Sequence, residues 1–172
     1  MTRTAYLHIP FCRSKCLYCD FYSSPGADEA RLDAYTRALL LQIGTAERAA
    51  LSSVYFGGGT PAVLGTRRLT ALLDALAARF SIDTDAEVTL ELNPNSLGCA
   101  DLAALRTAGF NRLSIGLQSA LPQGLAALGR THTAEDFLRC VDSARKAGFS
   151  NLSADMIFAV GGGKAIDTCK VL

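Results

Sequence analysis

Short runs of apolar residues alternate along this chain with stretches in which apolar residues recur every three or four positions. The runs are stopped by glycine, proline or polar residues and predict buried strands, whereas the three- and four-residue recurrence predicts amphipathic helices. Four strands are expected at residues 4–9, 54–56, 88–92 and 113–117, and a fifth strand holds Asp155. Strands that alternate with helices of roughly 10 to 15 residues favour a parallel sheet, because parallel strands need a long crossover connection.

The apolar faces also indicate where the helices begin and end. The first helix is apolar on one face over residues 32–43, and the second over residues 69–80, with Thr66 as its expected N-cap. The third helix is expected to close at Gly109 and the last at Gly148, because glycine suits a left-handed C-cap. The sequence therefore predicts an α/β fold built from successive strand–helix units.

Polar or glycine features follow, or lie within, each of the five predicted strands. In a parallel barrel the functional site lies at the carboxyl ends of the strands, where the loops between strand and helix meet. We therefore expect these features to line one mouth, although they are far apart in the sequence. In chain order they are the cysteine loop at 12–19, the glycine run at 57–59, Glu91 with Asn93, Gln118 with Ser119, and Asp155.

Three cysteines follow the first predicted strand in the spacing C-x-x-x-C-x-x-C, at Cys12, Cys16 and Cys19. They can reach one metal centre if the chain loops around it. A structural zinc site needs four protein ligands, and the sequence shows no second C-x-x-C or H-x-x-x-H pair downstream. The spacing fits a cubane [4Fe–4S] cluster better, since three cysteines would leave the fourth iron free for another ligand. The other interpretation is three unrelated core cysteines, because free cysteine is often buried.

Length and composition favour one ordinary globular domain. The chain has 172 residues, of which 49% are hydrophobic and 19% charged, a mixture that can build a core and does not indicate disorder. The net charge of +1 and the lack of a basic run argue against a nucleic-acid partner. No apolar stretch reaches the length of a membrane span, and the polar start MTRT does not resemble a signal peptide. We therefore expect a cytoplasmic protein, in a reducing compartment that keeps its thiols available.

The cysteine motif, with Tyr18 just before its third cysteine, resembles the signature of radical S-adenosylmethionine (SAM) proteins. The flanking words HIPFC and YCDFYS resemble the branch that contains oxygen-independent coproporphyrinogen III oxidases and the haem chaperones. This resemblance implies an incomplete parallel TIM-like barrel of about four to five strand–helix units. It also implies a [4Fe–4S] cluster whose open iron binds SAM and whose electron cleaves SAM to a 5′-deoxyadenosyl radical. A low-potential electron donor and a haem or porphyrin partner are expected with it.

The same resemblance implies a set of cofactor-binding residues. The run GGGTP matches the glycine motif of the family, which lies beside the methionyl part of SAM, where a glycine backbone can approach a ligand closely. Glu91 would meet a positively charged group of SAM, Arg130 its carboxylate and Asp155 its ribose hydroxyls. The two matched tyrosines would lie near the cluster and the adenosyl group. The matched positions are Tyr6, Tyr18, Gly58, Gly59, Thr60, Glu91, Gln118, Arg130 and Asp155.

Each of these features has a simpler interpretation when taken alone. The run GGGTP is also typical of a turn before a helix, and Glu91 or Asp155 could be a solvated or salt-bridged carboxylate. Arg130 could belong to an exposed loop, and His132 is also expected in a loop. His8 is expected to be packed or hydrogen bonded rather than to bind metal. The placement of the whole set at one end of one sheet is what favours a binding site.

Two positions differ from the family pattern. The oxidases carry a further cysteine two residues after the cluster motif, where this chain has Phe21, and Leu17 replaces a usual proline. Phe21 therefore favours the haem-chaperone branch, whose members bind haem and are not expected to decarboxylate coproporphyrinogen. The alternatives are an oxygen-independent coproporphyrinogen III oxidase and an inactive iron–sulfur module. The sequence leaves open whether the protein is an enzyme.

The resemblance divides the chain into two parts. Residues 1–158 match the radical SAM core, whereas residues 159–172 form a divergent glycine-rich tail. The tail sequence GGGKAIDTCK resembles the segment of glycerol dehydrogenase that meets the NAD pyrophosphate at a helix start. A truncated or rejoined reading frame is the preferred explanation. A dinucleotide site is the alternative, although the rest of a nucleotide-binding domain is missing.

Overall fold

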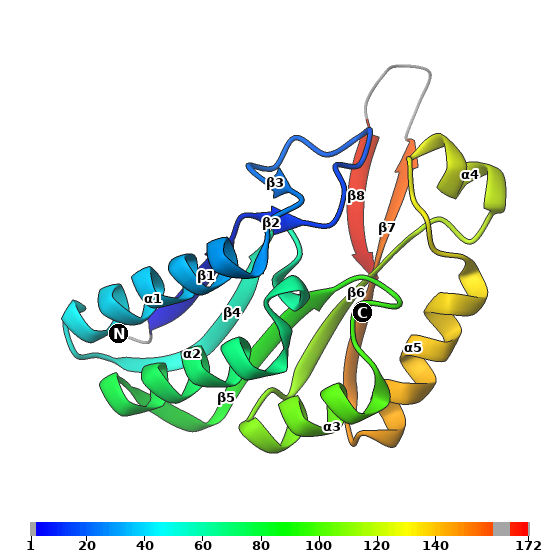
Figure 1. Cartoon of the computed structure of the whole chain (residues 1–172). Coiled ribbons are helices and arrows are strands. Elements are labelled where there is room, and N and C mark those ends of the chain that lie inside the picture. The colour runs from blue at the N-terminus through cyan, green and yellow to red at the C-terminus, as the bar shows by residue number, and fades with distance from the viewer. Residues whose placement is uncertain (1–2, 160–165, 172) are drawn as a thin grey trace.

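The structure, a computed structural model, describes residues 3–159 and 166–171. Its main feature is a curved sheet (Figure 1) formed by β1 (Arg3–Ile9), β4 (Ala50–Gly58), β5 (Ser81–Leu92), β6 (Arg112–Gln118), β7 (Asn151–Ala159) and β8 (Ile166–Val171). The strands are neighbours in this order; the first five are parallel, and β8 is antiparallel to β7. A separate small sheet joins β2 (Phe11–Cys12) and β3 (Ser24–Pro25).

The helices connect the parallel strands, and the longer ones lie along one face of the sheet (Figure 1). They are α1 (Glu29–Thr45), the 3₁₀ helix η1 (Pro61–Leu64), α2 (Gly65–Arg79), α3 (Cys99–Ala108), α4 (Pro122–Ala127) and α5 (Ala134–Lys146). α1 packs on α2, α2 on α3 and α3 on α5, so the layer follows the order of the chain. This arrangement confirms the predicted α/β fold with a parallel sheet, in the form of an incomplete TIM-like barrel.

The face of the sheet that packs on the helices is apolar. Phe56 of β4, Leu90 of β5 and Leu113 of β6 are fully buried. Phe56 pairs with Leu90, and Leu90 with Leu113, so their side chains form one continuous layer across three strands. Burial of each such side chain contributes about 1.5–3 kcal/mol. The core therefore lies between the sheet and the helices.

The opposite face of the sheet is polar. Thr89 lies beside Arg112, and Glu91 beside Ser114, in the register of β5 and β6. The buried Arg112 guanidinium donates to the Thr89 hydroxyl (Nη1–Oγ1, 3.3 Å) and to Ser153 of β7 (Nη2–Oγ, 3.2 Å). A buried cation needs such partners. Polar side chains thus bond to one another across the strands and lead toward the carboxyl ends of the sheet.

Two predicted helix ends are confirmed, at Gly109 and Gly148, and the structure adds a side-chain cap at the start of α5. The Thr133 hydroxyl accepts a hydrogen bond from the Asp136 amide (3.1 Å) and caps α5. Gly109 ends α3 with φ 117°, and Gly148 follows α5 with φ 93°. Both glycines are left-handed, as the C-cap prediction requires. β4 and β5 are longer than predicted, because polar residues that precede their apolar runs, such as Ser53 and Glu87, still pair in the ladder.

One prediction about the elements is wrong. Thr66 is not an N-cap, because α2 follows η1 directly and its N-cap residue is Leu64. The Thr66 hydroxyl donates instead to Asp101 of α3 (Oγ1–Oδ1, 2.9 Å). In the tail, residues 166–171 form the strand β8. The glycine run at 161–163 lies outside the described residues.

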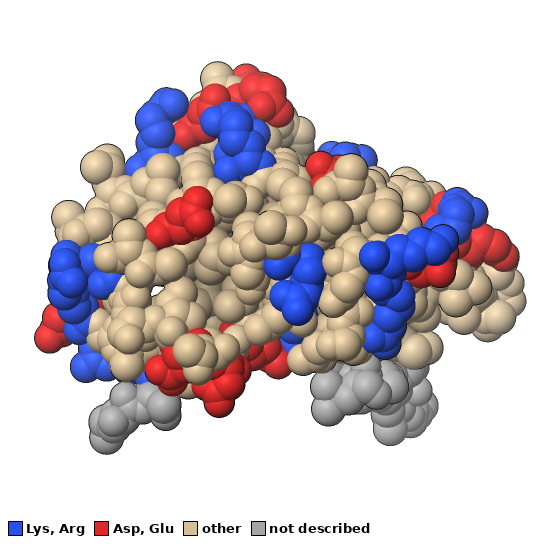
Figure 2. Space-filling view, turned by 90° about the horizontal axis from the view of Figure 1, so that it is seen from below, with Lys and Arg blue, Asp and Glu red and all other residues tan. Residues whose placement is uncertain are grey.

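Charged side chains of both signs are interspersed on the face of the molecule seen in Figure 2. That face lies at the bottom of the view in Figure 1, away from the cysteine loop. It therefore presents no extended field of one sign, in agreement with the net charge of +1. Among the described residues, no helix combines the length and the apolar character needed to cross a membrane.

Candidate functional site

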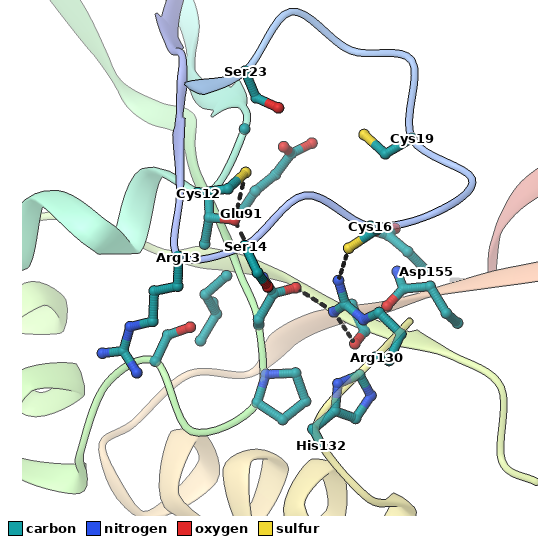
Figure 3. A pocket seen from close by; sticks show the side chains of 18 of the residues that line it. Cys12, Arg13, Ser14, Cys16, Cys19, Ser23, Glu91, Arg130, His132 and Asp155 are labelled. Atoms are coloured by element: carbon teal, nitrogen blue, oxygen red, sulfur yellow. Dashed lines mark hydrogen bonds between the residues drawn. The ribbon is translucent and has the colours of Figure 1, made fainter. Parts of the chain in front are cut away.

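A cavity of about 320 Å³ opens at the carboxyl ends of the parallel strands (Figure 3). It is bordered by the cysteine loop after β1, the glycine loop after β4, and the ends of β5, β6 and β7. Of the residues matched to cluster or cofactor binding, all but Tyr6 are among the described residues that line this cavity, whereas Gly57 and Ser119, also expected at the mouth, do not line it. The topology of the sheet therefore brings together side chains that are far apart in the sequence.

The cysteine loop runs between the paired strands β2 and β3. Cys12 lies on β2, whereas Cys16 and Cys19 lie in the loop, where the Cys19 amide donates to the Cys16 carbonyl (3.3 Å). The Lys15 ammonium donates to the Phe21 carbonyl (Nζ–O, 2.8 Å) and ties two parts of the loop together. All three thiols are half-buried and border the cavity (Figure 3).

Two of the thiols receive hydrogen bonds from other loops. The Thr60 hydroxyl donates to Cys12 (Oγ1–Sγ, 3.5 Å). Arg130 donates to Cys16 (Nη1–Sγ, 3.3 Å), as Figure 3 shows. Both donors also contact Asn93, whose Nδ2 donates to Thr60 Oγ1 (3.2 Å) and whose Oδ1 accepts from Arg130 Nη2 (2.5 Å). The cysteine loop is thus connected to the glycine loop and to the end of β5.

The three thiols surround the cavity and do not meet at one point. Among the described residues, no group of three or more histidine, cysteine, aspartate or glutamate side chains is arranged to hold a metal ion. A zinc ion would need its sulfur ligands at about 2.3 Å. In a cubane cluster each cysteine binds a different iron, so the sulfurs stand further apart. A cluster therefore does not require the three sulfurs to meet at one point.

The glycine loop after β4 packs on the cysteine loop through its backbone. The Gly59 amide donates to the Ile9 carbonyl (2.8 Å), and the Thr60 amide to the Phe11 carbonyl (2.7 Å). A Cβ on Gly59 would lie 2.7 Å from the Phe11 oxygen, so a larger residue would force the loops apart. Gly58 has φ 112°, a conformation that favours glycine. These glycines allow the two loops to approach each other closely.

Glu91 of β5 reaches the cavity and is bonded to a tyrosine on the neighbouring strand. The Tyr55 hydroxyl donates to Glu91 Oε1 at 2.5 Å. Burial, and then this hydrogen bond, raise the pKa of Tyr55. Tyr6 lies outside the cavity lining, where its ring stacks on Tyr55 with 6.0 Å between centroids. Burial and the charge of Glu91 also raise the pKa of Tyr6.

Asp155 of β7 lies at the cavity on the side of β6 (Figure 3). The fully buried Ser114 hydroxyl donates to its carboxylate (Oγ–Oδ1, 3.0 Å). The Ser114 oxygen also lies 3.3 Å from the Ser153 hydroxyl. The bonded polar side chains of the sheet thus extend as far as the cavity, where the Ser114 hydrogen bond orients Asp155.

Gln118 and Arg130 each have a buried polar atom that lacks a hydrogen-bond partner in the described part of the chain, Gln118 Oε1 and Arg130 Nε. Both residues line the cavity. Gln118 also has φ 59°, a left-handed conformation that is uncommon for a residue with a side chain. A buried polar group without a partner costs about 1–3 kcal/mol. Such groups and such backbone conformations concentrate where a ligand completes the bonding.

The sequence matches the Radical SAM superfamily over residues 6–165. The chain belongs to this family. Membership implies a [4Fe–4S] cluster and SAM as cofactors. This result agrees with the interpretation of the cysteine motif as a cluster site.

The radical SAM chain is similar to proteins more than twice its length. It is 37% identical over 159 residues to the heme chaperone HemW of Lactococcus lactis, and the match covers 92% of this chain and 42% of the relative. It is 40% identical over 161 residues to the mitochondrial radical S-adenosyl methionine domain-containing protein 1 of Bos taurus, with 90% and 36% covered. The structure of the Escherichia coli coproporphyrinogen III oxidase HemN matches with a TM-score of 0.83 and 28% identity, over 92% of this chain and 38% of that one. The chain thus spans less than half the length of these relatives.

The residues of the cavity fit the radical SAM cofactors. Cys12, Cys16 and Cys19 offer three thiolates from one loop to a cluster. Gln118 Oε1 offers an acceptor and Arg130 Nε a donor, which suits a ligand that carries both amino-acid and nucleoside groups. The cavity volume of about 320 Å³ also lies at the lower end of the range for small-molecule sites, roughly 300–1,000 Å³.

Two ring side chains border the cysteine loop of this radical SAM site. Burial raises the pKa of Tyr18 to about 12, although the nearby Arg130 cation acts in the opposite direction. The phenol is therefore protonated at neutral pH and can donate a hydrogen bond. His8 is hydrogen bonded, as expected, with its Nε2 3.2 Å from the Tyr22 carbonyl.

Several residues of the radical SAM cavity lie outside the predicted cofactor-binding set, among them Asn93, Ser114 and His132. The sequence predicts Asn93 at the mouth without a binding role and makes no prediction for Ser114. The available signal for Ser114 was a polar residue inside the otherwise apolar strand LSIGL. His132 lies in a loop as expected, but it is only 7% exposed, and its Nε2 lies 3.1 Å from the Leu117 carbonyl. No local sequence pattern signals that contact.

Proposed function

We propose that this chain binds a [4Fe–4S] cluster through Cys12, Cys16 and Cys19 and binds SAM in the adjoining cavity. We propose that the protein formed in this way acts as a haem chaperone. The single observation that carries the binding proposal is the pair of buried atoms without partners, Gln118 Oε1 and Arg130 Nε, on the cavity wall. Because family membership implies both cofactors, a ligand of this chemistry is the one expected to complete their bonding.

The walls of the cavity offer different groups to SAM. The backbone of the glycine loop at 58–60 would border the methionyl part, and Glu91 would complement its positive charge. Arg130 would bind the carboxylate, and Asp155, oriented by Ser114, would accept from the ribose hydroxyls. Near the adenosyl group we place Tyr18 and Gln118. When both cofactors are bound, the cluster supplies the electron that cleaves the sulfonium of SAM.

Phe21 supports the haem-chaperone assignment. It stands where the oxidases carry a further cysteine, and it is 69% exposed at the cavity. Leu17 and Tyr22 of the same loop are exposed as well. Exposed rings and aliphatic groups beside the cluster loop suit a flat, largely apolar partner such as haem. The similarity to HemW heme chaperones of several bacteria agrees with this assignment.

The second candidate function is an oxygen-independent coproporphyrinogen III oxidase. The match to the HemN structure, with a TM-score of 0.83, favours it. The lower sequence identity to HemN, 28% against 37% for the Lactococcus lactis heme chaperone, argues for the chaperone. Both functions need a low-potential electron donor and a haem or porphyrin partner. Both also need a reducing compartment, and we place the protein in the cytoplasm for that reason.

Anaerobic reconstitution with iron and sulfide tests the cluster. The wild-type chain should take up about four irons and four sulfides and turn brown, whereas Cys16→Ala should lose both properties. Cys99→Ala is the matched control, because Cys99 is an exposed cysteine on α3, away from the residues that border the cavity. Stoichiometric zinc without sulfide in the wild-type protein would contradict the proposal.

Haem titration and turnover separate the candidate functions. A chaperone should bind haem, seen as a Soret band that saturates, and should release no carbon dioxide from coproporphyrinogen. Decarboxylation coupled to formation of 5′-deoxyadenosine would identify an oxidase instead. A chain that forms the cluster but neither binds haem nor cleaves SAM would be an inactive iron–sulfur module.

A further inference from the structure

Asn93 lies at the centre of a hydrogen-bond chain that joins two of the three motif cysteines. On one side its Nδ2 donates to Thr60 Oγ1 (3.2 Å), and the Thr60 hydroxyl donates to Cys12 Sγ (3.5 Å). On the other side its Oδ1 accepts from Arg130 Nη2 (2.5 Å), and Arg130 Nη1 donates to Cys16 Sγ (3.3 Å). One carboxamide at the end of β5 thus reaches both sulfurs through one intermediate residue on each side.

The two ends of this carboxamide have different roles. A guanidinium has no acceptor, so Arg130 can bond only to the oxygen of Asn93, and the amino group is turned toward Thr60. A hydroxyl has a single hydrogen. Because Thr60 Oγ1 already accepts from Asn93, that hydrogen is left for Cys12 Sγ. Asn93 therefore fixes the direction of the Thr60–Cys12 hydrogen bond and holds the Arg130 guanidinium in the position from which it donates to Cys16.

The neighbouring strand provides the room that Asn93 needs. A Cβ on Gly116 of β6 would lie 2.9 Å from Asn93 Oδ1 and 3.0 Å from Gln118 Nε2. The Gly116 carbonyl also accepts from Arg130 Nη2 (3.4 Å). The position of the carboxamide is thus determined by two strands and by the arginine.

We propose that Asn93 is a positioning residue that orients the hydrogen bonds to Cys12 and Cys16 and thereby sets the reduction potential of the cluster. This inference rests on the proposed function, because it needs a cluster on these cysteines. Hydrogen bonds to the sulfurs stabilise the reduced cluster, which carries more negative charge, and so raise its reduction potential. Loss of Asn93 leaves the cysteines in the chain and makes the cluster harder to reduce.

The first measurement uses the chain without a cluster. Under anaerobic, reducing conditions, iodoacetamide should alkylate Cys12 and Cys16 severalfold more slowly in Asn93→Ala than in the wild type, because the donors that stabilise the reactive thiolates are no longer held against the two sulfurs. Cys19 takes no part in the hydrogen-bond chain, so its rate should change little. Mass spectrometry of the digested protein gives each rate separately. Equal rates at Cys12 and Cys16 in the two proteins would overturn the role of Asn93, whatever the result with iron.

The second measurement is the reduction potential of the reconstituted protein, followed by electron paramagnetic resonance. We expect about tenfold less reduced cluster at a fixed potential, which is a shift of about 59 mV to more negative values for a one-electron couple. Asn93→Ala and Asn93→Asp should both show it. An aspartate at this position still accepts from Arg130, but it has no donor and competes with Cys12 for the Thr60 hydrogen. An unchanged potential in Asn93→Ala overturns the proposal, and a shift in Asn93→Asp alone assigns the effect to the added charge.

Asn111→Ala is the matched control for loss of a bridging asparagine. Asn111 donates to the Ala86 carbonyl (Nδ2–O, 2.8 Å) and accepts from the Val88 amide (2.8 Å), but it lies just before β6, at the opposite end of the sheet from the cavity. This variant should lose stability and keep the wild-type potential. A shift as large as that of Asn93→Ala would overturn the proposal, because it would show a general loss of structure. If the wild-type chain takes up no cluster, the proposed function fails; if it takes up a normal cluster and Asn93→Ala matches it, only the role of Asn93 fails.

Discussion

At the scale of single residues, Glu91 shows how a cavity side chain depends on the residue behind it. Its Oε1 accepts from the Tyr55 hydroxyl at 2.5 Å, and a hydrogen bond to a charged acceptor is stronger than one between neutral groups. Burial, and then the bond itself, raise the pKa of Tyr55. The phenol is therefore a constant donor at neutral pH, and it orients the carboxylate that we assign to the positive charge of SAM.

Tyr55→Phe should cost more stability than the same change at Tyr35. Tyr35 donates to a neutral acceptor, the His8 carbonyl (2.7 Å). Loss of a bond to a neutral group costs about 0.5–1.5 kcal/mol, against about 1.5–3 kcal/mol for a bond to a charged group. Urea denaturation of both variants measures the free energies of unfolding. Tyr55→Phe alone should also weaken SAM binding to the reconstituted protein in calorimetry, and equal costs in the two variants would argue against a special role for the Glu91 bond.

Sequence motifs identify the types of residue in the site better than they identify conformations. All the residues matched to cluster or cofactor binding, except Tyr6, line the cavity. The left-handed φ of Gln118, 59°, was not predictable, because it accompanies a register shift between β6 and β7. The burial of His132 against Leu117 likewise depends on how a loop packs on a distant strand end. Such features arise from tertiary packing, which leaves no local pattern.

At the scale of elements, the site depends on the close approach of the loop after β4 to the loop after β1. Gly59→Ala should separate them, because the new Cβ would lie 2.7 Å from the Phe11 oxygen, a backbone atom that cannot rotate away. We expect the free energy of unfolding to fall by about 1–3 kcal/mol. Iron uptake on reconstitution should fall as well, since the glycine loop also carries Thr60, the partner of Cys12. Urea denaturation and iron analysis measure the two effects.

Gly44→Ala is the matched control for that change. Gly44 is exposed within α1, and a Cβ there would meet none of the described residues within 4 Å. Alanine is favoured over glycine inside a helix by about 0.5–1 kcal/mol. This variant should therefore gain stability and keep normal iron uptake. A Gly59→Ala protein that matches it in both properties would show that the two loops can separate without cost.

The elements that sequence patterns predict are the long ones. Alternating apolar runs and helical faces indicate the five parallel strands and the helices between them, because each pattern extends over several residues. β2 and β3 have two residues each, and α4 has six, so they are too short to show a period. Thr66 resembles an N-cap by residue type, but the preceding η1 already leads into α2. Short elements and junctions therefore had to come from the structure.

At the scale of the whole molecule, the polar groups of the sheet fall into two classes. Arg112 and Ser153, deep on the polar face, bond to each other and to neighbouring strands. Gln118 and Arg130, at the carboxyl end, keep a buried atom without a partner among the described residues. The apolar core on the helix side supplies the stability that tolerates this cost. The fold therefore places the buried polar atoms that lack partners where a bound ligand can supply their hydrogen bonds.

The pH dependence of stability should report on His132, which is buried beside the cavity. Burial lowers the pKa of His132, the contact with the Leu117 carbonyl raises it, and the nearby Arg130 cation lowers it further. As the pH falls, the unfolded chain, in which histidine has a pKa of about 6.5, takes up a proton before the folded chain does. The free energy of unfolding should therefore decrease below about pH 6.5, with a slope of up to about 1.4 kcal/mol per pH unit from this residue.

His132→Gln should flatten the curve in that range, because glutamine does not titrate and its amide can still donate to the Leu117 carbonyl, which lies 3.1 Å from His132 Nε2. Asp136 acts in a different range. The Thr133 amide lowers its pKa, so its contribution to stability is lost only as the pH falls below the ordinary aspartate value of about 3.9. Urea denaturation of the ligand-free chain between about pH 7 and pH 5 isolates the histidine effect. A slope in this range that is the same for the wild type and for His132→Gln would mean that the folded chain protonates His132 as readily as the unfolded chain does.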